Sequence, residues 1–171
     1  MDYIRAIRNH LGQIPRASVE GAASLVASAK SVHLFGNGGS AAICSHAAVD
    51  LTKACELQAY TYHDSALLTC FSNDYGYDNA YAEIIKKFVT ADDCVILISS
   101  SGTSSNILNA AAAAGQKGVS LITLSGFASD NDLSKLPSDQ HCYIDSDNYN
   151  VVETMHLIIL LSVAEFLMSE S

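Results

Sequence analysis

The chain has 171 residues, of which 49% are hydrophobic and 16% charged. This length and composition suit one domain with a sizeable core and exclude an intrinsically disordered chain. Its 18 acidic residues against 9 basic ones give a formal net charge of −9. Such a charge repels phosphate backbones and anionic lipid, so we expect neither a nucleic-acid-binding nor a membrane-surface protein.

Both termini and the cysteines predict a cytoplasmic protein. The first residues, MDYIRAIRNHLG, lack the basic-then-apolar pattern of a signal peptide. The five cysteines form no C-x-x-C pair and stand among apolar neighbours, which predicts buried free thiols in a reducing compartment. The apolar C-terminal run is interrupted by Glu153, His156 and Glu165, so we interpret it as a core or subunit-interface helix rather than a membrane span.

The predicted elements alternate along the chain. Helical spacing of Ile4, Ile7, Leu11 and Ile14 predicts a first helix punctuated by Pro15, and an Ala-rich segment near residues 18–29 predicts a second. The expected strands are 31–35, 57–62, 94–99, 119–125 and 141–145. The later expected helices follow residue 40, begin near 65 before a polar loop at 72–78, cover 79–89 and 106–118, and end the chain from about 151.

Alternating strands and helices predict an α/β fold. We expect a parallel sheet of about five strands with helices on both faces, a three-layer and flavodoxin-like arrangement. The N-terminal helices, residues 1–30, would precede a core of residues 31–171 that ends in the long helix. Nothing in the sequence divides the chain, so we expect a single domain.

Two strands end in polar loops that each open a helix. GNGGS, residues 36–40, follows the first strand, and SSSGTS, residues 99–104, follows the run CVILI. Ligands collect at the carboxyl ends of the strands in such sheets, and a helix N-terminus offers free N–H groups and a partial positive charge. With the hydroxyls of Ser99, Ser101, Thr103 and Ser104, these loops could hold a phosphate monoester without Lys or Arg.

The alternative is that the small residues of these loops only cap helices. Two such loops on neighbouring strands favour a ligand site over capping. Neither loop has the spacing of a dinucleotide fingerprint or a P-loop, so we expect no nucleotide cofactor.

His46 and Asp50 stand four residues apart on the helix that follows GNGGS. This spacing places both side chains on one helix face, which we expect to lie beside the glycine loop. They could share a divalent metal or transfer protons directly. An ordinary surface hydrogen bond is the alternative interpretation of the same pair.

Four segments in order, GNGGSA with the following His46 and Asp50, SNDYGYD, ISSSGTSSNIL and VETMH, resemble the sugar isomerase (SIS) domain family. More narrowly, they resemble its phosphoheptose isomerase branch, along essentially the whole chain. The resemblance implies interconversion of sedoheptulose 7-phosphate and D-glycero-D-manno-heptose 7-phosphate, which supplies lipopolysaccharide or capsule heptose. It also implies a homotetramer, or at least a homodimer, that often carries one zinc ion per subunit.

The resemblance also assigns site residues. Sugar contacts would come from Asn37, Gly38, Gly39, Ser40, Asn73, Asp74 and Glu153, and the phosphate would be held by Ser99, Ser100, Ser101 and Ser104. Asp50 and Glu153 would be the catalytic acid–base groups. His46, Asp50 and Glu153 would be the candidate zinc ligands.

The chain departs from the family at two positions. Asp50 stands where the family usually has Glu, and Leu161 stands where the family has its second acid–base and metal-binding His. His156 lies about 140° around the helix from position 161, so we expect it to support the site or an interface rather than replace that His. Loss of the His also leaves open a non-catalytic SIS protein that binds a phosphosugar or a protein partner.

Overall fold

The computed structural model describes residues 2–170 and contains a five-stranded parallel sheet. The strands are β1 (Val32–Gly36), β2 (Ala59–Thr61), β3 (Cys94–Ser99), β4 (Ser120–Ser125) and β5 (Gln140–Tyr143), in the order β2-β1-β3-β4-β5. This is the flavodoxin-like order, and the predicted fold class is therefore confirmed.

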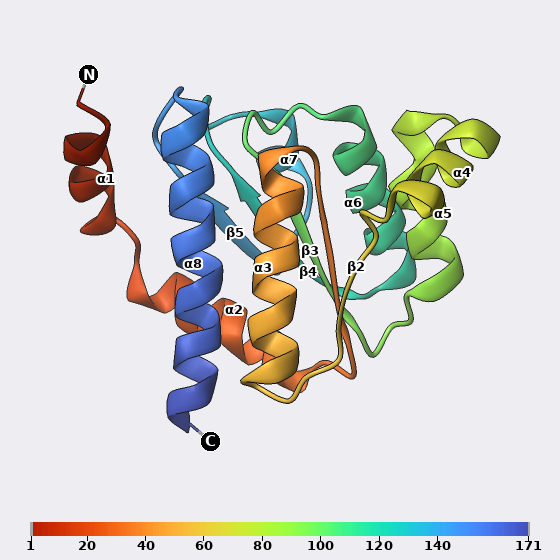
Figure 1. Cartoon of the computed structure of the whole chain (residues 1–171), viewed down its shortest axis with the longest axis horizontal. Coiled ribbons are helices and arrows are strands. Elements are labelled where there is room, and N and C mark those ends of the chain that lie inside the picture. The colour runs from red at the N-terminus through yellow and green to blue at the C-terminus, as the bar shows by residue number, and fades with distance from the viewer. Residues whose placement is uncertain (1, 171) are drawn as a thin grey trace.

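Helices cover both faces of the sheet, as Figure 1 shows. One hydrophobic cluster joins α1 (Tyr3–Leu11), α2 (Arg16–Ser28), α3 (Gly39–Lys53) and α8 (Tyr149–Glu170) to one face. A second cluster joins α4 (Ser65–Tyr75), α5 (Tyr77–Phe88), α6 (Ser105–Lys117) and α7 (Asp132–Lys135) to the other. The chain thus leaves β1 on one face and β3 on the opposite face, which opens a crevice between these two strands at their carboxyl ends.

Local sequence explains the central βα unit. Every residue of β3 is buried, because its uninterrupted apolar run faces helices on both sides. The following α6 ends at Gly118, whose φ of +67° is a left-handed conformation that glycine adopts without a Cβ penalty. Both boundaries lie within one residue of the sequence prediction.

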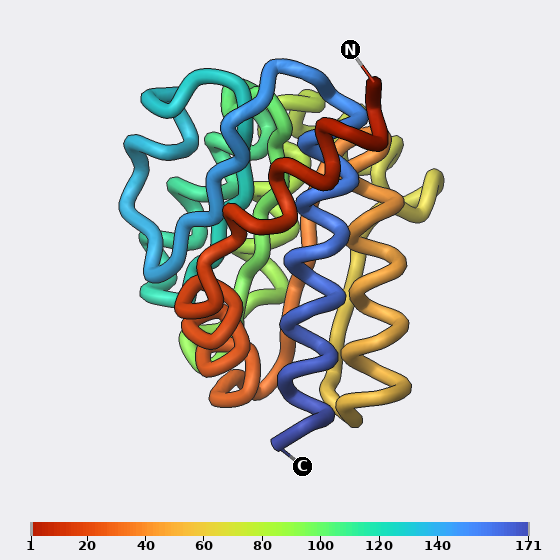
Figure 2. The backbone as a smooth tube through the Cα atoms, turned by 90° about the vertical axis from the view of Figure 1, so that its left-hand side faces the viewer, coloured from red at the N-terminus to blue at the C-terminus, as the bar shows by residue number. Residues whose placement is uncertain are grey.

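The long helix α8 runs beside α3, with the two helices starting from the same edge of the sheet (Figures 1 and 2). Within residues 2–170 it is the one helix long and apolar enough to cross a membrane, by length and composition alone. Its side chains Val152, Met155 and Ile159 are buried in the core that α2 and α3 also form. The expectation of a core helix agrees with this packing.

Several sequence expectations are wrong in detail. The first helix ends at Leu11, before Ile14, and the short helix α7 was not expected. The segment 72–75, expected in a polar loop, continues α4 as far as Tyr75. Three of the five thiols are buried as predicted, but Cys55 is half-buried and Cys70 is exposed, because α4 buries none of its residues fully.

Candidate functional site

The glycine loop connects β1 to α3. Gly38 has φ +54° and ψ −119°, a backbone conformation that a side chain would strain. Gly39, the first residue of α3, allows the carboxylate of Glu153 to approach the helix mouth closely: a Cβ at Gly39 would lie 2.7 Å from Oε1 of Glu153. Ser40 is buried behind the loop. The loop is therefore shaped by glycine at two positions for two different reasons.

The serine loop connects β3 to α6. Gly102 has φ +70°, and a Cβ there would overlap the side chain of Asn131, a buried residue that caps α7. The hydroxyls bond to one another: Ser99 Oγ donates to Ser104 Oγ at 3.1 Å, and Ser101 and Thr103 form a hydrogen bond at 3.0 Å. These hydroxyls are gathered on one side of the turn at the mouth of α6.

Capping does not explain these loops. Asp2 and Asp64 cap α1 and α4 with side-chain oxygens. In the described chain, by contrast, Ser104 makes no side-chain cap hydrogen bond at α6, and α3 begins after Gly38, which has no side chain to cap with. Without a side-chain cap, both helix mouths keep their positive partial charge for another acceptor, although the Ser40 amide of α3 already donates to the Asn37 carbonyl at 2.9 Å.

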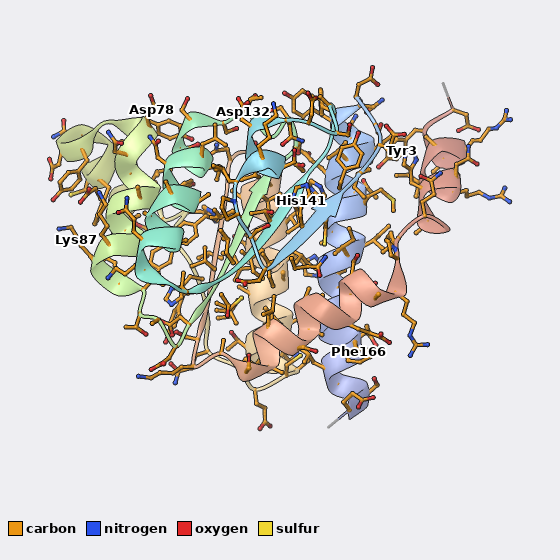
Figure 3. All side chains as sticks on the ribbon, turned by 180° about the vertical axis from the view of Figure 1, so that it is seen from behind. Tyr3, Asp78, Lys87, Asp132, His141 and Phe166 are labelled. Atoms are coloured by element: carbon orange, nitrogen blue, oxygen red, sulfur yellow. The ribbon has the colours of Figure 1, made fainter. Side chains whose placement is uncertain are left out.

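The two loops lie side by side. β1 and β3 are neighbours, with Gly36 paired to Ile98 in the parallel register. The hydroxyls of Ser40 and Ser100, both buried, are 3.5 Å apart across the crevice. Neither loop contains a Lys or Arg, and Figure 3 shows Asp78 and Asp132 at the same upper edge of the molecule. An anion bound here would be held by amides and hydroxyls.

The start of α5 also contacts the glycine loop, through a hydrogen-bonded group of Asn37, Asn106 and Tyr77. Asn37 and Asn106 donate to each other, both at 2.9 Å, and the Tyr77 hydroxyl donates to Asn37 Oδ1 at 2.8 Å. Asn106 is 2% exposed, whereas Tyr77 is 48% exposed. Sequence reasoning missed both residues as part of the site. The available signal was the type of residue at the second position of α6. An Asn side chain there can form hydrogen bonds outside its own helix, which marks Asn106 as a candidate.

Glu153 comes from the first turns of α8 and faces the first residue of α3. It lines a surface cavity of about 300 Å³ together with Tyr3, Asn150 and Thr154. The structure thus brings Glu153 to the glycine loop. Of the two carboxylates predicted to act in catalysis, this one lies at the carboxyl edge of the sheet.

His46 and Asp50, which we expected beside the glycine loop, lie farther along α3. They follow Gly39 by seven and eleven residues, which places them about 10 and 16 Å along the axis of α3. His46 Nε2 and Asp50 Oδ2 are 3.6 Å apart, and the side chains are 51% and 37% exposed. Within one subunit, this pair lies on the outer surface of α3, away from the helix mouth.

Asn73 and Asp74 are exposed at the C-terminal end of α4, where Asn73 Nδ2 donates to Asp74 Oδ1 at 3.0 Å. The turn that follows them contains Gly76, with φ +79°, and leads directly to Tyr77. The hydrogen bond of Tyr77 to Asn37 therefore fixes this turn against the glycine loop. Within residues 2–170, Asp74 accepts from Asn73 and from Cys70 of the same helix, and neither Asn73 nor Asp74 makes a hydrogen bond to either loop.

Within one subunit, the candidate zinc ligands are separated along α3. A catalytic zinc takes three protein ligands, and the described residues contain no group of three His, Cys, Asp or Glu side chains positioned to hold a metal. His46 and Asp50 supply two ligands, and Glu153 faces the other end of α3.

His156 is wholly buried inside the chain, so it is not an interface residue. Its Nε2 donates to the carbonyl of Ser125, at the carboxyl end of β4, at 3.1 Å. Burial lowers the pKa of His156 to about 4, so the ring is neutral at physiological pH. It holds α8 against the sheet and has no access to a ligand in the crevice.

A separate cavity of about 440 Å³ lies at the opposite edge of the sheet, at the amino ends of β1, β2 and β3. Its polar residues bond to one another: Asp93 accepts from Ser31 Oγ at 2.6 Å and from the Thr90 amide at 2.7 Å, and His33 bonds to Ser31 and Tyr62. These internal contacts satisfy the buried groups. The crevice between β1 and β3 remains the candidate site.

Comparison with known proteins identifies the family of this chain. Residues 2–126 match the family model described as SIS domain. The phosphoheptose isomerase of Helicobacter pylori (strain Shi470) is 33% identical over 133 residues, covering 74% of this chain and 68% of the relative. The phosphoheptose isomerase of Bradyrhizobium sp. (strain ORS 278) is 30% identical over 184 residues, covering 93% and 90%.

The same relationship holds in three dimensions. The phosphoheptose isomerase GmhA from Neisseria gonorrhoeae superposes with a TM-score of 0.89 at 26% identity, over 98% of this chain and 94% of that one. Vibrio vulnificus NanR in complex with ManNAc-6P shares the fold, with a TM-score of 0.78 at 17% identity, over 98% of this chain and 60% of that one. The chain therefore belongs to the SIS domain family, in its phosphoheptose isomerase branch.

Proposed function

We propose that this protein is a phosphoheptose isomerase that interconverts sedoheptulose 7-phosphate and D-glycero-D-manno-heptose 7-phosphate. The observation that carries the proposal is the pair of uncapped helix mouths at adjacent strand ends, in a chain whose relatives are phosphoheptose isomerases. The product would supply heptose for a cell-surface glycan, and the enzyme would work in the cytoplasm.

The serine loop is the proposed phosphate seat. The hydroxyls of Ser99, Ser100, Ser101 and Ser104 and the first amides of α6 would donate to the phosphate oxygens. Hydrogen bonds to charged acceptors are stronger than neutral ones, so several donors can replace a cationic side chain. No nucleotide is required for this reaction.

The sugar would extend from the phosphate across the glycine loop. The backbone of Gly38 and Gly39, the hydroxyl of Ser40 and the side chain of Asn37 line this path, and Asn73 and Asp74 would approach from the turn before α5. The N-terminus of α3 points at the same region. Its partial positive charge would stabilise negative charge that develops on the sugar oxygens.

The chemistry requires a base that takes a proton from the carbon beside the carbonyl and returns it to the neighbouring carbon. Glu153 is the proposed proton carrier at the glycine loop, because its carboxylate faces Gly39 at the mouth of α3. The enediolate formed between these two steps would be held by the amides of the same loop. Hydrogen bonds from the protein to the hydroxyls of the distal sugar carbons would fix the orientation of the substrate.

Asp50 would act on a second copy of the chain. Helix geometry puts it about 16 Å along α3 from Gly39, and its side chain is 37% exposed. Apolar side chains also remain exposed nearby, including Val49 at 57% and Met168 at 37%. A homotetramer assembled through the outer faces of α3 and α8 would bury them and bring Asp50 to a neighbouring crevice.

Zinc, if it binds, would also need this assembly. His46 and Asp50 fit two positions of a zinc site, and a third ligand would have to come from another subunit. A bound zinc would polarise the carbonyl oxygen and so make the adjacent C–H more acidic. The proton transfer assigned to Glu153 does not depend on it.

The second candidate is a non-catalytic phosphosugar-binding protein, which the Leu161 substitution favours. Calorimetry and NMR on one sample distinguish the two functions. An isomerase binds sedoheptulose 7-phosphate and also produces the aldose signals, whereas a binding protein shows the heat of binding with an unchanged sugar spectrum. Absence of binding at millimolar concentration would contradict both.

A further inference from the structure

We infer that Asn106 and Tyr77 are positioning residues that couple the phosphate seat to the sugar loop through the side chain of Asn37. This inference rests on the proposed function, because it assigns the two loops to the phosphate and the sugar. Neither residue would touch the reacting atoms. Their role would be to make the glycine loop respond when the serine loop is occupied.

The contacts place three helix N-termini around one side chain. Asn37 precedes α3 by two residues, Asn106 is the second residue of α6, and Tyr77 is the first residue of α5. The Asn37 carboxamide accepts from Asn106 Nδ2 and from the Tyr77 hydroxyl, and it donates to Asn106 Oδ1. All three bonds are 2.8–2.9 Å long. One amide therefore sets the relative position of three loops.

Burial makes the central pair rigid. Asn106 is 2% exposed, so losing its partner would leave buried amide atoms without hydrogen bonds, which is costly. Tyr81 supports the same loop from below, because its buried hydroxyl donates to the carbonyl of Gly36 at 2.8 Å. The glycine loop cannot shift independently of α6 without breaking the reciprocal pair.

The serine loop lies directly before Asn106. Ser104 is the N-cap of α6 and Asn106 follows it by two residues. An anion that draws the first amides of α6 toward it would move Asn106, and the reciprocal amide pair would carry that movement to Asn37 and Gly38. The arrangement would thus place the sugar loop correctly only when a phosphate is present, which would favour phosphorylated sugars.

Amide NMR of the full chain titrated with inorganic phosphate tests the coupling. In the wild type, the Gly102 and Gly38 resonances should shift together with one dissociation constant. In Asn106→Ala, the Gly102 shift should persist while the Gly38 shift falls on the order of fivefold or more, because both hydrogen bonds between Asn106 and Asn37 are removed. Gln116→Ala is the control, since Gln116 is exposed near the opposite end of the same helix.

Tyr77→Phe provides a second variant that keeps the fold, because the hydroxyl it removes is at an exposed residue. It should weaken the Gly38 response without abolishing the Gly102 response. In turnover assays, Asn106→Ala should lower kcat about 10- to 100-fold and leave KM within about threefold, because the phosphate seat is intact and only the sugar is misplaced.

The possible results distinguish the proposed coupling from the proposed phosphate seat. If Gly102 shifts but Gly38 does not, or if Gly38 responds equally in wild type and Asn106→Ala, the coupling is wrong while the phosphate seat stands. If neither resonance responds to phosphate, the proposed seat and the coupling both fall.

Discussion

The carboxylate of Glu153 on α8 occupies the place that a side chain on Gly39 of α3 would take. A Cβ at Gly39 would lie 2.7 Å from Glu153 Oε1, closer than real Cβ contacts allow. Gly39→Ala should therefore push the carboxylate away from the helix mouth. We expect kcat to fall about 10- to 100-fold, because a displacement of about 1 Å in a reacting group can have this effect.

The same substitution should hardly change the free energy of unfolding, by less than about 1 kcal/mol, since only the end of a flexible side chain must move. Gly115→Ala is the control, because nothing within residues 2–170 lies within 4 Å of a Cβ at Gly115. Steady-state kinetics and urea unfolding of both variants measure the difference. Equal activity in the two variants would contradict the role given to Glu153.

Glu153→Gln and Asp50→Asn test the division of labour between the carboxylates. Removing the proton carrier should lower kcat by about 10²- to 10⁴-fold, and we expect Asp50→Asn also to reduce turnover. Mixing the two impaired variants should restore activity if Asp50 of one copy completes the crevice of another. Recovery after subunit exchange, measured by turnover and light scattering, supports the shared site; no recovery in verified mixed oligomers places both groups in one subunit.

The phosphate seat is tested at Ser101 and Ser104. Each hydroxyl would donate to a charged oxygen, a bond whose loss typically costs about 1.5–3 kcal/mol, so Ser101→Ala and Ser104→Ala should each raise KM about tenfold or more. Ser45→Ala, which removes a hydroxyl bonded only to the Ala41 carbonyl within α3, should leave KM unchanged. Unaltered KM in both loop variants would move the phosphate away from residues 99–104.

Leu161 can be used to test the zinc site. It follows Glu153 by eight residues on α8, which is about 12 Å along that axis. α8 runs beside α3 from the same edge (Figure 2), and the rise per residue of the two helices gives position 161 a depth between those of His46 and Asp50. Leu161→His should supply a third ligand and raise zinc affinity about tenfold or more, measured by competition with a chelating dye. The double variant with His46→Ala should lose that gain.

Stability should fall in mild acid because of His156. Burial lowers its pKa in the folded protein to about 4, whereas the unfolded value is about 6.5, so the unfolded chain binds the extra proton first. The contribution is complete above pH 6.5 and is lost as the pH falls toward 4, roughly 3 kcal/mol in all. His156→Met should flatten this part of the pH dependence of unfolding, measured by urea titration at pH 7, 5.5 and 4.5.

Local patterns predicted the elements well, but not how the ends of the helices relate to the loops. The apolar run of β3 and the left-handed Gly118 mark their boundaries in the sequence because backbone geometry and burial act locally there. Spacing also predicted that His46 and Asp50 share a face of α3. The separation from Gly39 likewise gives their distance of about 10 and 16 Å along the helix, but the sequence does not say whether another subunit lies against that face.

Contacts between residues far apart in the sequence could not be predicted from local patterns. Asn37 and Asn106 are 69 residues apart, and only the strand order brings them together. Asn73 and Asp74 looked like loop residues because Asn, Asp and Gly favour turns, yet α4 continues through them until Gly76 breaks it. The backbone hydrogen bond from the Gly76 N–H to the Ser72 carbonyl carries the helix past both residues.

Solvent-deuterium incorporation tests the central claim most directly. With sedoheptulose 7-phosphate in D₂O, the purified protein should place one deuterium at C1 of the ketose and at C2 of the aldose, at a rate that Glu153→Gln reduces. Tight sugar-phosphate binding without any deuterium at either carbon, with and without added zinc, would show that this crevice holds its ligand but does not move its proton.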